Sequence, residues 1–276
     1  MTTKAFVLGH PIKHSRSPLI HGTWLEHYGI DGNYEAIDVA PEALAGFFDR
    51  LRDGEFAGGN VTIPHKEAVF ALCDSVDPLA RTIGAVNTLV VKEGKVHGQN
   101  TDYLGFLGNL DAAAPGWARD VHTAIVLGAG GAARAILVAL QSRGIHSIML
   151  LNRTRATAED MAESLPGEIV PAGLSDFAYL ASLADLVVNT SSVGMHGSRF
   201  ADLDLGKVGK QALVTDIVYT PLNTPLLAEA QARGLRTVDG LGMLLHQAVP
   251  GFEAWFGVRP EVTPDLRARV QATLGG

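Results

Sequence analysis

Lys66 is a residue whose type and position could serve acid–base chemistry. It follows Val61-Thr62-Ile63 and Pro64 in the stretch GGNVTIPHKEAV, residues 58–69, where a strand is expected to end and a helix to begin. Most lysines are exposed, so a solvated residue at a helix start is one interpretation. A cation in the first turn of a helix opposes the helix macrodipole, however. A lysine placed to move a proton is therefore the second interpretation.

Several uncharged polar side chains and one carboxylate also follow apolar runs in residues 1–103. They are Ser15 and Ser17 in HSRSPLIH, Asn60 and Thr62 in NVTIPHKE, Asn87 in AVNTLV, and Asp102 in GQNTDYLGF. Each has a structural explanation as a helix cap or a strand-end residue. All of them are nevertheless expected at the edge of a sheet where α/β proteins bind ligands. The set therefore predicts a polar site for a small molecule.

A glycine-rich turn lies further along the chain, in IVLGAGGAAR. It places Gly128, Ala129, Gly130, Gly131 and Ala132 between an apolar strand and the start of a helix. Gly128 permits the tight turn, and Gly130 lets the backbone approach a pyrophosphate at the helix N-terminus. In this strand–turn–helix context the pattern predicts a dinucleotide site.

The next apolar strand, SIMLL, ends in Asn152, Arg153, Thr154 and Arg155. A site for NAD usually offers an acidic residue here for the ribose 2′-hydroxyl. Arginines and neutral hydrogen-bonding groups instead suit a 2′-phosphate. The alternative is an exposed basic helix start. The pattern favours NADP as the cofactor.

The elements that must position these residues alternate between strands and helices. Residues 4–76 read as βαβ units with a helix over KEAVFALCDSV, and a hairpin with its turn at Glu93-Gly94 follows. A second alternating block has the rhythm of a doubly wound nucleotide-binding domain. We therefore expect an α/β protein with a substrate domain at 1–103 and a Rossmann-like domain at 104–241. The C-terminal helices, 242–276, are expected to pack back onto the first domain.

Composition excludes several classes of function. The chain has 276 residues, 47% of them hydrophobic and 18% charged, with a net charge of −7. It has no basic stripe for a nucleic acid and no apolar run of the roughly 20 residues needed to cross a membrane. Cys73 is the only cysteine, so no intrachain disulfide forms, and no metal-ligand pattern is found. These features favour a cytoplasmic protein that binds a small molecule.

Eight motifs together carry a resemblance to a known family. They are HSRSPLIH, NVTIPHKE, GAVNTL, NTDYLGF, GAGGAAR, NRT, NTSSVGM and DGLGMLLHQA. In this order and over nearly the whole chain, they resemble the shikimate dehydrogenase family. The resemblance implies the reversible NADPH-dependent reduction of 3-dehydroshikimate to shikimate, a step in the biosynthesis of aromatic amino acids through chorismate.

The resemblance also implies roles for individual residues. Lys66 and Asp102 would form the catalytic pair. The substrate would be held by Ser15, Ser17, Asn60, Thr62, Asn87, Tyr219 and Gln247. The cofactor would be lined by Gly128, Ala129, Gly130, Gly131, Ala132, Asn152, Arg153, Thr154, Arg155, Ile217 and Gly240. Because these motifs lie in different blocks, hydride transfer would require the two domains to close over the substrate.

Two positions depart from the family pattern. Tyr103 follows Asp102 where many members have glycine, and Thr157 stands where a further arginine is common. Two alternative functions stay open, namely a broader quinate/shikimate dehydrogenase and a non-catalytic NADPH-binding regulator. A homodimer is compatible with the sequence, which does not determine the oligomeric state.

Overall fold

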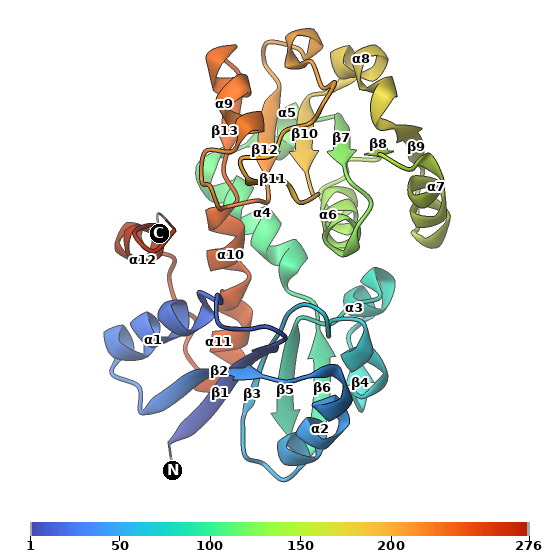
Figure 1. Ribbon diagram of the computed structural model, residues 1–276. Coiled ribbons are helices and arrows are strands. Elements are labelled where there is room, and N and C mark those ends of the chain that lie inside the picture. Colours follow the sequence, from blue (N-terminus) through green and yellow to red (C-terminus); the bar gives the residue numbers. More distant parts are fainter. Residues whose placement is uncertain (1, 275–276) are drawn as a thin grey trace. The chain divides into compact units, whose positions relative to one another are not determined.

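The computed structural model describes residues 2–274 (Figure 1). The chain divides into two compact units, each with its own six-stranded sheet. One unit comprises the residues up to Asp102 together with Leu245–Val270, and the other contains Tyr103–Leu244. The expected return of the C-terminal helices to the first part of the chain is therefore confirmed. None of the helices in residues 2–274 is long and apolar enough to cross a bilayer.

The first unit contains a mixed sheet. Its elements are β1 (Thr3–Gly9), α1 (Ser17–Tyr28), β2 (Gly32–Asp38), η1 (Pro41–Ala43), α2 (Leu44–Arg52), β3 (Gly58–Val61), η2 (Ala68–Ala71), β4 (Ser75–Val76), α3 (Pro78–Ile83), β5 (Thr88–Lys92), β6 (Lys95–Gln99), α11 (Ala248–Phe256) and α12 (Pro264–Gln271). The strand order is β2-β1-β3-β5-β6-β4. β1 pairs in parallel with β2 and β3, whereas β5 pairs antiparallel with β3 and β6.

The two faces of this sheet are covered by different helices. Phe6 and Leu8 of β1 pack with Phe47, Phe48 and Leu51 of α2 in one apolar cluster. α1 and α11 contact each other, and both also contact strands of the sheet. The indole Nε1 of Trp255 in α11 donates to the carbonyl of Leu89 in β5 at 2.8 Å. This bond attaches the returning segment to the sheet.

The prediction of a helix over KEAVFALCDSV is wrong. Only the short η2 forms there, and the chain then enters β4. Asp74 N donates to Val96 O at 2.9 Å, and Val96 N donates to Asp74 Oδ2 at 2.8 Å. Because these bonds align the chain with β6, the helix cannot continue. Lys66 consequently lies in a turn before η2, so the macrodipole argument does not apply to it.

The second unit contains a parallel sheet. Its elements are α4 (Asp102–Ala113), α5 (Trp117–Asp120), β7 (Thr123–Leu127), α6 (Gly131–Ser142), β8 (Ser147–Asn152), α7 (Arg155–Ser164), β9 (Ile169–Gly173), η3 (Leu174–Asp176), α8 (Phe177–Leu180), η4 (Ala181–Leu183), β10 (Leu186–Asn189), β11 (Val193–His196), η5 (Leu205–Lys207), β12 (Leu213–Asp216), α9 (Pro225–Ala232), β13 (Arg236–Val238) and α10 (Leu241–His246). The strand order is β13-β12-β10-β7-β8-β9, with every pairing parallel. This order reverses direction between β7 and β10, as in a doubly wound fold.

A carboxylate is buried at the end of β12. Asp216 is 1% exposed and accepts hydrogen bonds from Asn189 Nδ2, Val218 N and Thr224 Oγ1 at 2.8, 2.9 and 2.7 Å. Burial raises the pKa of Asp216 from 3.8 to about 6, although these hydrogen bonds oppose the shift. The ionised carboxylate therefore costs stability at neutral pH.

A buried histidine in the first unit gives stability the opposite dependence on pH. His21 is fully buried, and neither of its ring nitrogens has a hydrogen-bond partner within residues 2–274. Its ring stacks on Tyr34 with the centroids 4.0 Å apart. Burial lowers the pKa of His21 from 6.5 to about 3. As the pH falls, His21 is protonated in the unfolded chain near pH 6.5 but in the folded protein only near pH 3. The folded protein therefore loses stability as the pH falls below 6.5.

We predict a specific pH dependence for the Asp216→Asn variant. The folded pKa of Asp216 is raised, so its stabilising effect is complete below pH 3.8 and is lost as the pH rises through about 6. Lowering the pH from about 8 to about 5, one unit below the folded pKa, should stabilise the wild type by about 1.4 kcal/mol more than Asp216→Asn. His21 is present in both proteins and cancels in this difference.

Urea titrations at the two pH values measure the free energies of unfolding. Asp185→Asn, which changes an aspartate at the opposite edge of the same sheet, is the matched control. Parallel pH profiles for the wild type and Asp216→Asn would contradict the prediction.

Candidate functional site

Lys66 and Asp102 form an ion pair in the first unit. Lys66 Nζ lies 2.7 Å from Asp102 Oδ2, and the side chains are 31% and 15% exposed. The backbone on both sides is held by hydrogen bonds, from Val86 N to Lys66 O at 2.8 Å and from Asp102 N to Asn100 Oδ1 at 3.0 Å. The pair is therefore positioned from two separate segments and is partly accessible to a ligand.

Asn87 extends this pair into a polar cluster. Its Oδ1 accepts from Thr101 N at 2.7 Å, and because a backbone N–H can only donate, the orientation of the amide is determined. Asn87 Nδ2 then donates to Asp102 Oδ1 at 2.8 Å and lies 3.4 Å from Gln247 Oε1. Thr101 Oγ1 donates to Gln247 O at 2.8 Å. The fold thus brings together four of the residues singled out in the sequence, Lys66, Asn87, Asp102 and Gln247.

Asn60 lies beneath this cluster, with its amide occupied by protein groups. It is 5% exposed. Its Oδ1 accepts from Tyr34 Oη at 2.7 Å, and its Nδ2 donates to Asn87 O at 3.3 Å and to Thr88 Oγ1 at 3.2 Å. These contacts support the strand ends that carry Asn87. They give Asn60 a supporting role, and the substrate contact expected from the sequence stays a prediction.

The serines and Thr62 lie where neighbouring strands end. Ser15 Oγ accepts from Ser17 N at 3.3 Å. Thr62 N donates to Leu8 O at 2.9 Å, so the end of β3 lies beside the end of β1. The chain after β1 continues into the loop that carries Ser15. Burial raises the pKa of Tyr34 well above its ordinary value, and a hydrogen bond with Ser17 opposes this shift. Ser17 is therefore linked through Tyr34 to Asn60.

The glycine-rich turn of the second unit leaves room for an anion. Gly128 has φ of +101°, and a Cβ there would lie 2.9 Å from Ser191 Cβ, so both conformation and space require glycine. A Cβ on Gly130 or Gly131 would meet nothing within 4 Å. No side chain caps the N-terminus of α6. The turn and the helix start therefore fit the phosphates of a dinucleotide.

The last residue of β8 and the three residues after it differ in what they contact. Asn152 Oδ1 accepts from Ala129 N at 3.3 Å, so it holds the glycine-rich turn. Arg155 Nε pairs with Glu159 Oε1 at 2.9 Å. Arg153 is exposed and has no hydrogen-bond or ion-pair partner among residues 2–274. Thr154 is also exposed. Arg153 is thus the arginine of this segment whose guanidinium is free to bind an anion.

The other cofactor candidates lie at the same edge of the sheet. A Cβ on Gly240 would lie 2.5 Å from Ile217 O, so the two backbones are in close contact. Tyr219 follows two residues after Ile217, and it therefore belongs to the second unit rather than to the unit that holds Lys66. Sequence reasoning missed Asp216 and singled out Asn189 only as the first residue of the motif NTSSVGM. Each ends an apolar run, ADLVVN and ALVTD, which is the same signal that identified candidates in the first unit.

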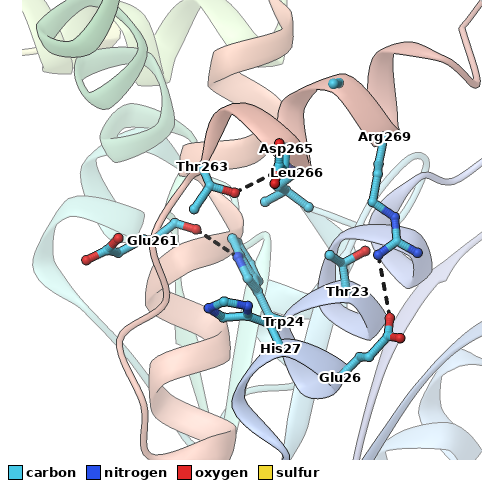
Figure 2. Close-up of a pocket in the computed structure, with 10 residues that line it drawn as sticks. Thr23, Trp24, Glu26, His27, Glu261, Thr263, Asp265, Leu266 and Arg269 are labelled. Carbon is cyan, nitrogen blue, oxygen red and sulfur yellow. Dashed lines mark hydrogen bonds and ion pairs between the residues drawn. The ribbon is translucent and has the colours of Figure 1, made fainter.

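A separate hollow lies on the first unit, away from these residues. Figure 2 shows it between α1, α12 and the segment before α12. Its volume is about 640 Å³. Trp24 Nε1 donates to Glu261 O at 2.9 Å across it, and Arg269 pairs with Glu26 at 3.5 Å. None of the candidate site residues lines it. Within residues 2–274, no group of three or more His, Cys, Asp or Glu side chains is arranged to hold a metal ion.

Comparisons with known proteins agree with the resemblance seen in the sequence. The family model of the shikimate dehydrogenase substrate binding domain matches residues 7–89. The model of shikimate / quinate 5-dehydrogenase matches residues 117–238, and that of the shikimate 5′-dehydrogenase C-terminal domain matches residues 240–268.

Individual relatives are similar over their full length. A protein of Mesorhizobium japonicum named shikimate dehydrogenase (NADP(+)) is 55% identical, over 99% of this chain and 97% of its own. A protein of the same name from Methylobacterium radiotolerans is also 55% identical, over 100% of this chain and 99% of its own.

A solved structure has the same fold. Shikimate 5-dehydrogenase of Thermus thermophilus, in complex with NADP(H) and shikimate, is 38% identical, with a TM-score of 0.87 over 99% of both chains. The three family models together match most of the chain, and the relatives exceed half identity over nearly all of it. This chain is a member of the shikimate dehydrogenase family.

Proposed function

We propose that this protein catalyses the reversible reduction of 3-dehydroshikimate to shikimate by NADPH, with Lys66 and Asp102 as the catalytic pair. Membership of the family supports the reaction, and one observation supports the pair. Lys66 Nζ lies 2.7 Å from Asp102 Oδ2, in a cluster with Asn87 and Gln247. The cluster is made of groups that can donate to, accept from and protonate an oxygen of a substrate.

Lys66 supplies the proton of the reaction. NADPH provides the hydride, which adds to the carbon of the ring carbonyl and leaves negative charge on its oxygen. The Lys66 ammonium stabilises this charge and then transfers a proton to the oxygen, giving the hydroxyl of shikimate. In the oxidative direction Lys66 accepts that proton. Asp102 orients Lys66 through the ion pair, and Asn87 in turn holds Asp102.

The remaining polar side chains bind the substrate. Ser15 and Ser17 are neutral donors suited to the carboxylate, while Thr62, Asn87 and Gln247 are suited to the ring hydroxyls. Tyr219 is a further proposed contact. Asn60, whose Oδ1 and Nδ2 are bonded to Tyr34, Asn87 and Thr88, is a further proposed contact near the ring hydroxyls.

The cofactor is bound by the second unit. The pyrophosphate is held at the start of α6 by the turn from Gly128 to Ala132, where the amides and the helix dipole favour an anion. Asn152 keeps this turn in place through Ala129 N. Arg153 binds the 2′-phosphate, with Thr154 and Arg155 beside it, and this charge pairing selects NADP over NAD.

Besides the roles of the site residues, three expectations from the sequence stay predictions. They are the cytoplasmic location, a possible homodimer and the domain boundaries at 103 and 241. Assays that follow NADPH absorbance, with shikimate and quinate and with NADP and NAD, decide whether quinate is also a substrate and separate an enzyme from a non-catalytic binding protein.

Lys66→Ala should lower kcat by about 10²- to 10⁴-fold, the usual cost of losing a general acid or base. The KM for shikimate should change much less, because Lys66 acts mainly on the transition state. Adding Asp102→Asn should cost less than the product of the two single effects, since the two residues act as one unit.

Steady-state kinetics of the four proteins test this prediction. Lys95→Ala, which removes an exposed lysine of the β5–β6 hairpin, is the control and should behave as the wild type. A Lys66→Ala enzyme with nearly normal kcat would show that Lys66 does not transfer the proton.

Arg153→Ala should weaken NADP binding by about 10- to 150-fold, from about 1.5–3 kcal/mol for a charge-assisted hydrogen bond. NAD binding should be nearly unchanged, because NAD lacks the 2′-phosphate. Arg155→Ala should have a smaller effect, since Arg155 is already paired with Glu159. Titration calorimetry with both cofactors measures these affinities. Equal weakening of NADP and NAD would rule out phosphate selection by Arg153.

A further inference from the structure

Asp216 is the centre of a buried hydrogen-bond cluster at the carboxyl edge of the second sheet. β10 ends at Asn189 and β12 at Asp216, and these two residues are partners in the parallel register. Asp216 Oδ1 accepts from Asn189 Nδ2 and Val218 N at 2.8 and 2.9 Å, and Oδ2 accepts from Thr224 Oγ1 at 2.7 Å. One carboxylate therefore joins two strand ends to the segment that follows β12.

Asn189 extends the effect of Asp216 to the glycine-rich turn. Asn189 Oδ1 accepts from Ser191 N at 3.0 Å and from Ser191 Oγ at 2.7 Å, and its Nδ2 also donates to Val193 O at 2.7 Å. Ser191 is packed against Gly128, where a Cβ would lie 2.9 Å from Ser191 Cβ. The orientation of the Asn189 amide thus determines where Ser191 lies beside the turn.

Asp216 also holds the segment that packs against Gly240. Its bond to Val218 N fixes the residue after Ile217. Ile217 N donates to Asn189 O at 3.1 Å. Ile217 O is so close to Gly240 that a Cβ on that glycine would lie 2.5 Å from it. The Ile217 backbone is therefore located by Asp216 on one side and by Gly240 on the other.

We infer that Asp216 is a positioning residue of the NADP site, which holds the segments of Gly128, Ile217 and Gly240 in their binding geometry. This inference rests on the proposed function. With 1% of its surface exposed, Asp216 acts through Asn189 and Val218 rather than by contact with the cofactor. A buried carboxylate is costly unless it is well hydrogen-bonded, and here both oxygens are used to organise loops.

Titration calorimetry of NADP with the Asp216→Ala variant tests the inference. Loss of a residue that orients a binding group costs about 10- to 100-fold at metal sites, and we expect a similar rise in the Kd for NADP. The KM for shikimate should rise less than the Kd for NADP, because Ser15, Ser17 and Asn87 lie in the other unit and only Tyr219 follows the segment that Asp216 holds. Asp216→Asn should stay within about threefold of the wild type, since its oxygen can still accept from Asn189 and Val218.

Asp185→Ala is the matched control. Asp185 Oδ2 accepts from His122 N and Thr123 N at 2.9 and 3.0 Å, at the amino edge of the same sheet. Its loss should lower the melting temperature and leave the Kd for NADP unchanged. A general loss of stability is thereby separated from a loss of binding geometry.

If Asp216→Ala does not fold, Thr224→Val tests the inference instead, because it removes only the contact to Asp216 Oδ2. This variant should weaken NADP binding by a few fold. Unchanged NADP affinity in folded Asp216→Ala, or in Thr224→Val if Asp216→Ala does not fold, with a wild type that binds NADP and oxidises shikimate, would overturn the inference alone. A wild type that does not bind NADP would overturn the proposed function itself.

Discussion

The orientation of the Asn87 amide is the constraint on which the polar cluster of the first unit depends. Thr101 N can only donate, so Asn87 Oδ1 must face it, and Asn87 Nδ2 is directed at Asp102. One oxygen of Asp102 is then occupied, and the other faces Lys66. An amide rotated by half a turn would place its nitrogen against Thr101 N and its oxygen against the carboxylate. The geometry of the ion pair therefore follows from a single backbone donor.

Both units use a buried polar side chain to organise the loops that follow their strands. Asn60 joins Tyr34 to the backbone of Asn87, and Asp216 joins Asn189 to the segment after β12. Asn60 is the penultimate residue of β3 and Asp216 is the last residue of β12, and both are almost fully buried, so their bonds are sheltered from water and strong. Asn189 and Asp216 end neighbouring parallel strands, whereas Asn87 precedes β5, which runs antiparallel to β3. In both units sheet pairing brings segments that are distant in sequence together.

Local signals in the chain predicted much of this structure. The Glu93-Gly94 turn joins β5 and β6 in register from Lys92↔Lys95 onward, because both turn residues adopt the positive φ that such a hairpin requires. The helical pattern over KEAVFALCDSV failed, since pairing of Asp74 with β6 overrides local propensity. The protein partners of Asn60 could not be predicted, because an asparagine near the end of a strand has the same local appearance whether it faces a substrate or the protein interior.

The sequence by itself determined the two-block α/β plan, the glycine-rich turn before α6 and the residue types available for proton transfer and anion binding. These are local properties, encoded in periodicity and in the conformational freedom of Gly128. Only the tertiary structure decided which polar groups meet. Lys66 and Asp102 are 36 residues apart, and Asn87 and Gln247 are 160 apart, so their contacts depend on sheet order and on the return of the C-terminal helices. Tertiary packing likewise directed the polar atoms of Asn60 and Asp216 inward, because buried donors and acceptors must find partners within the protein.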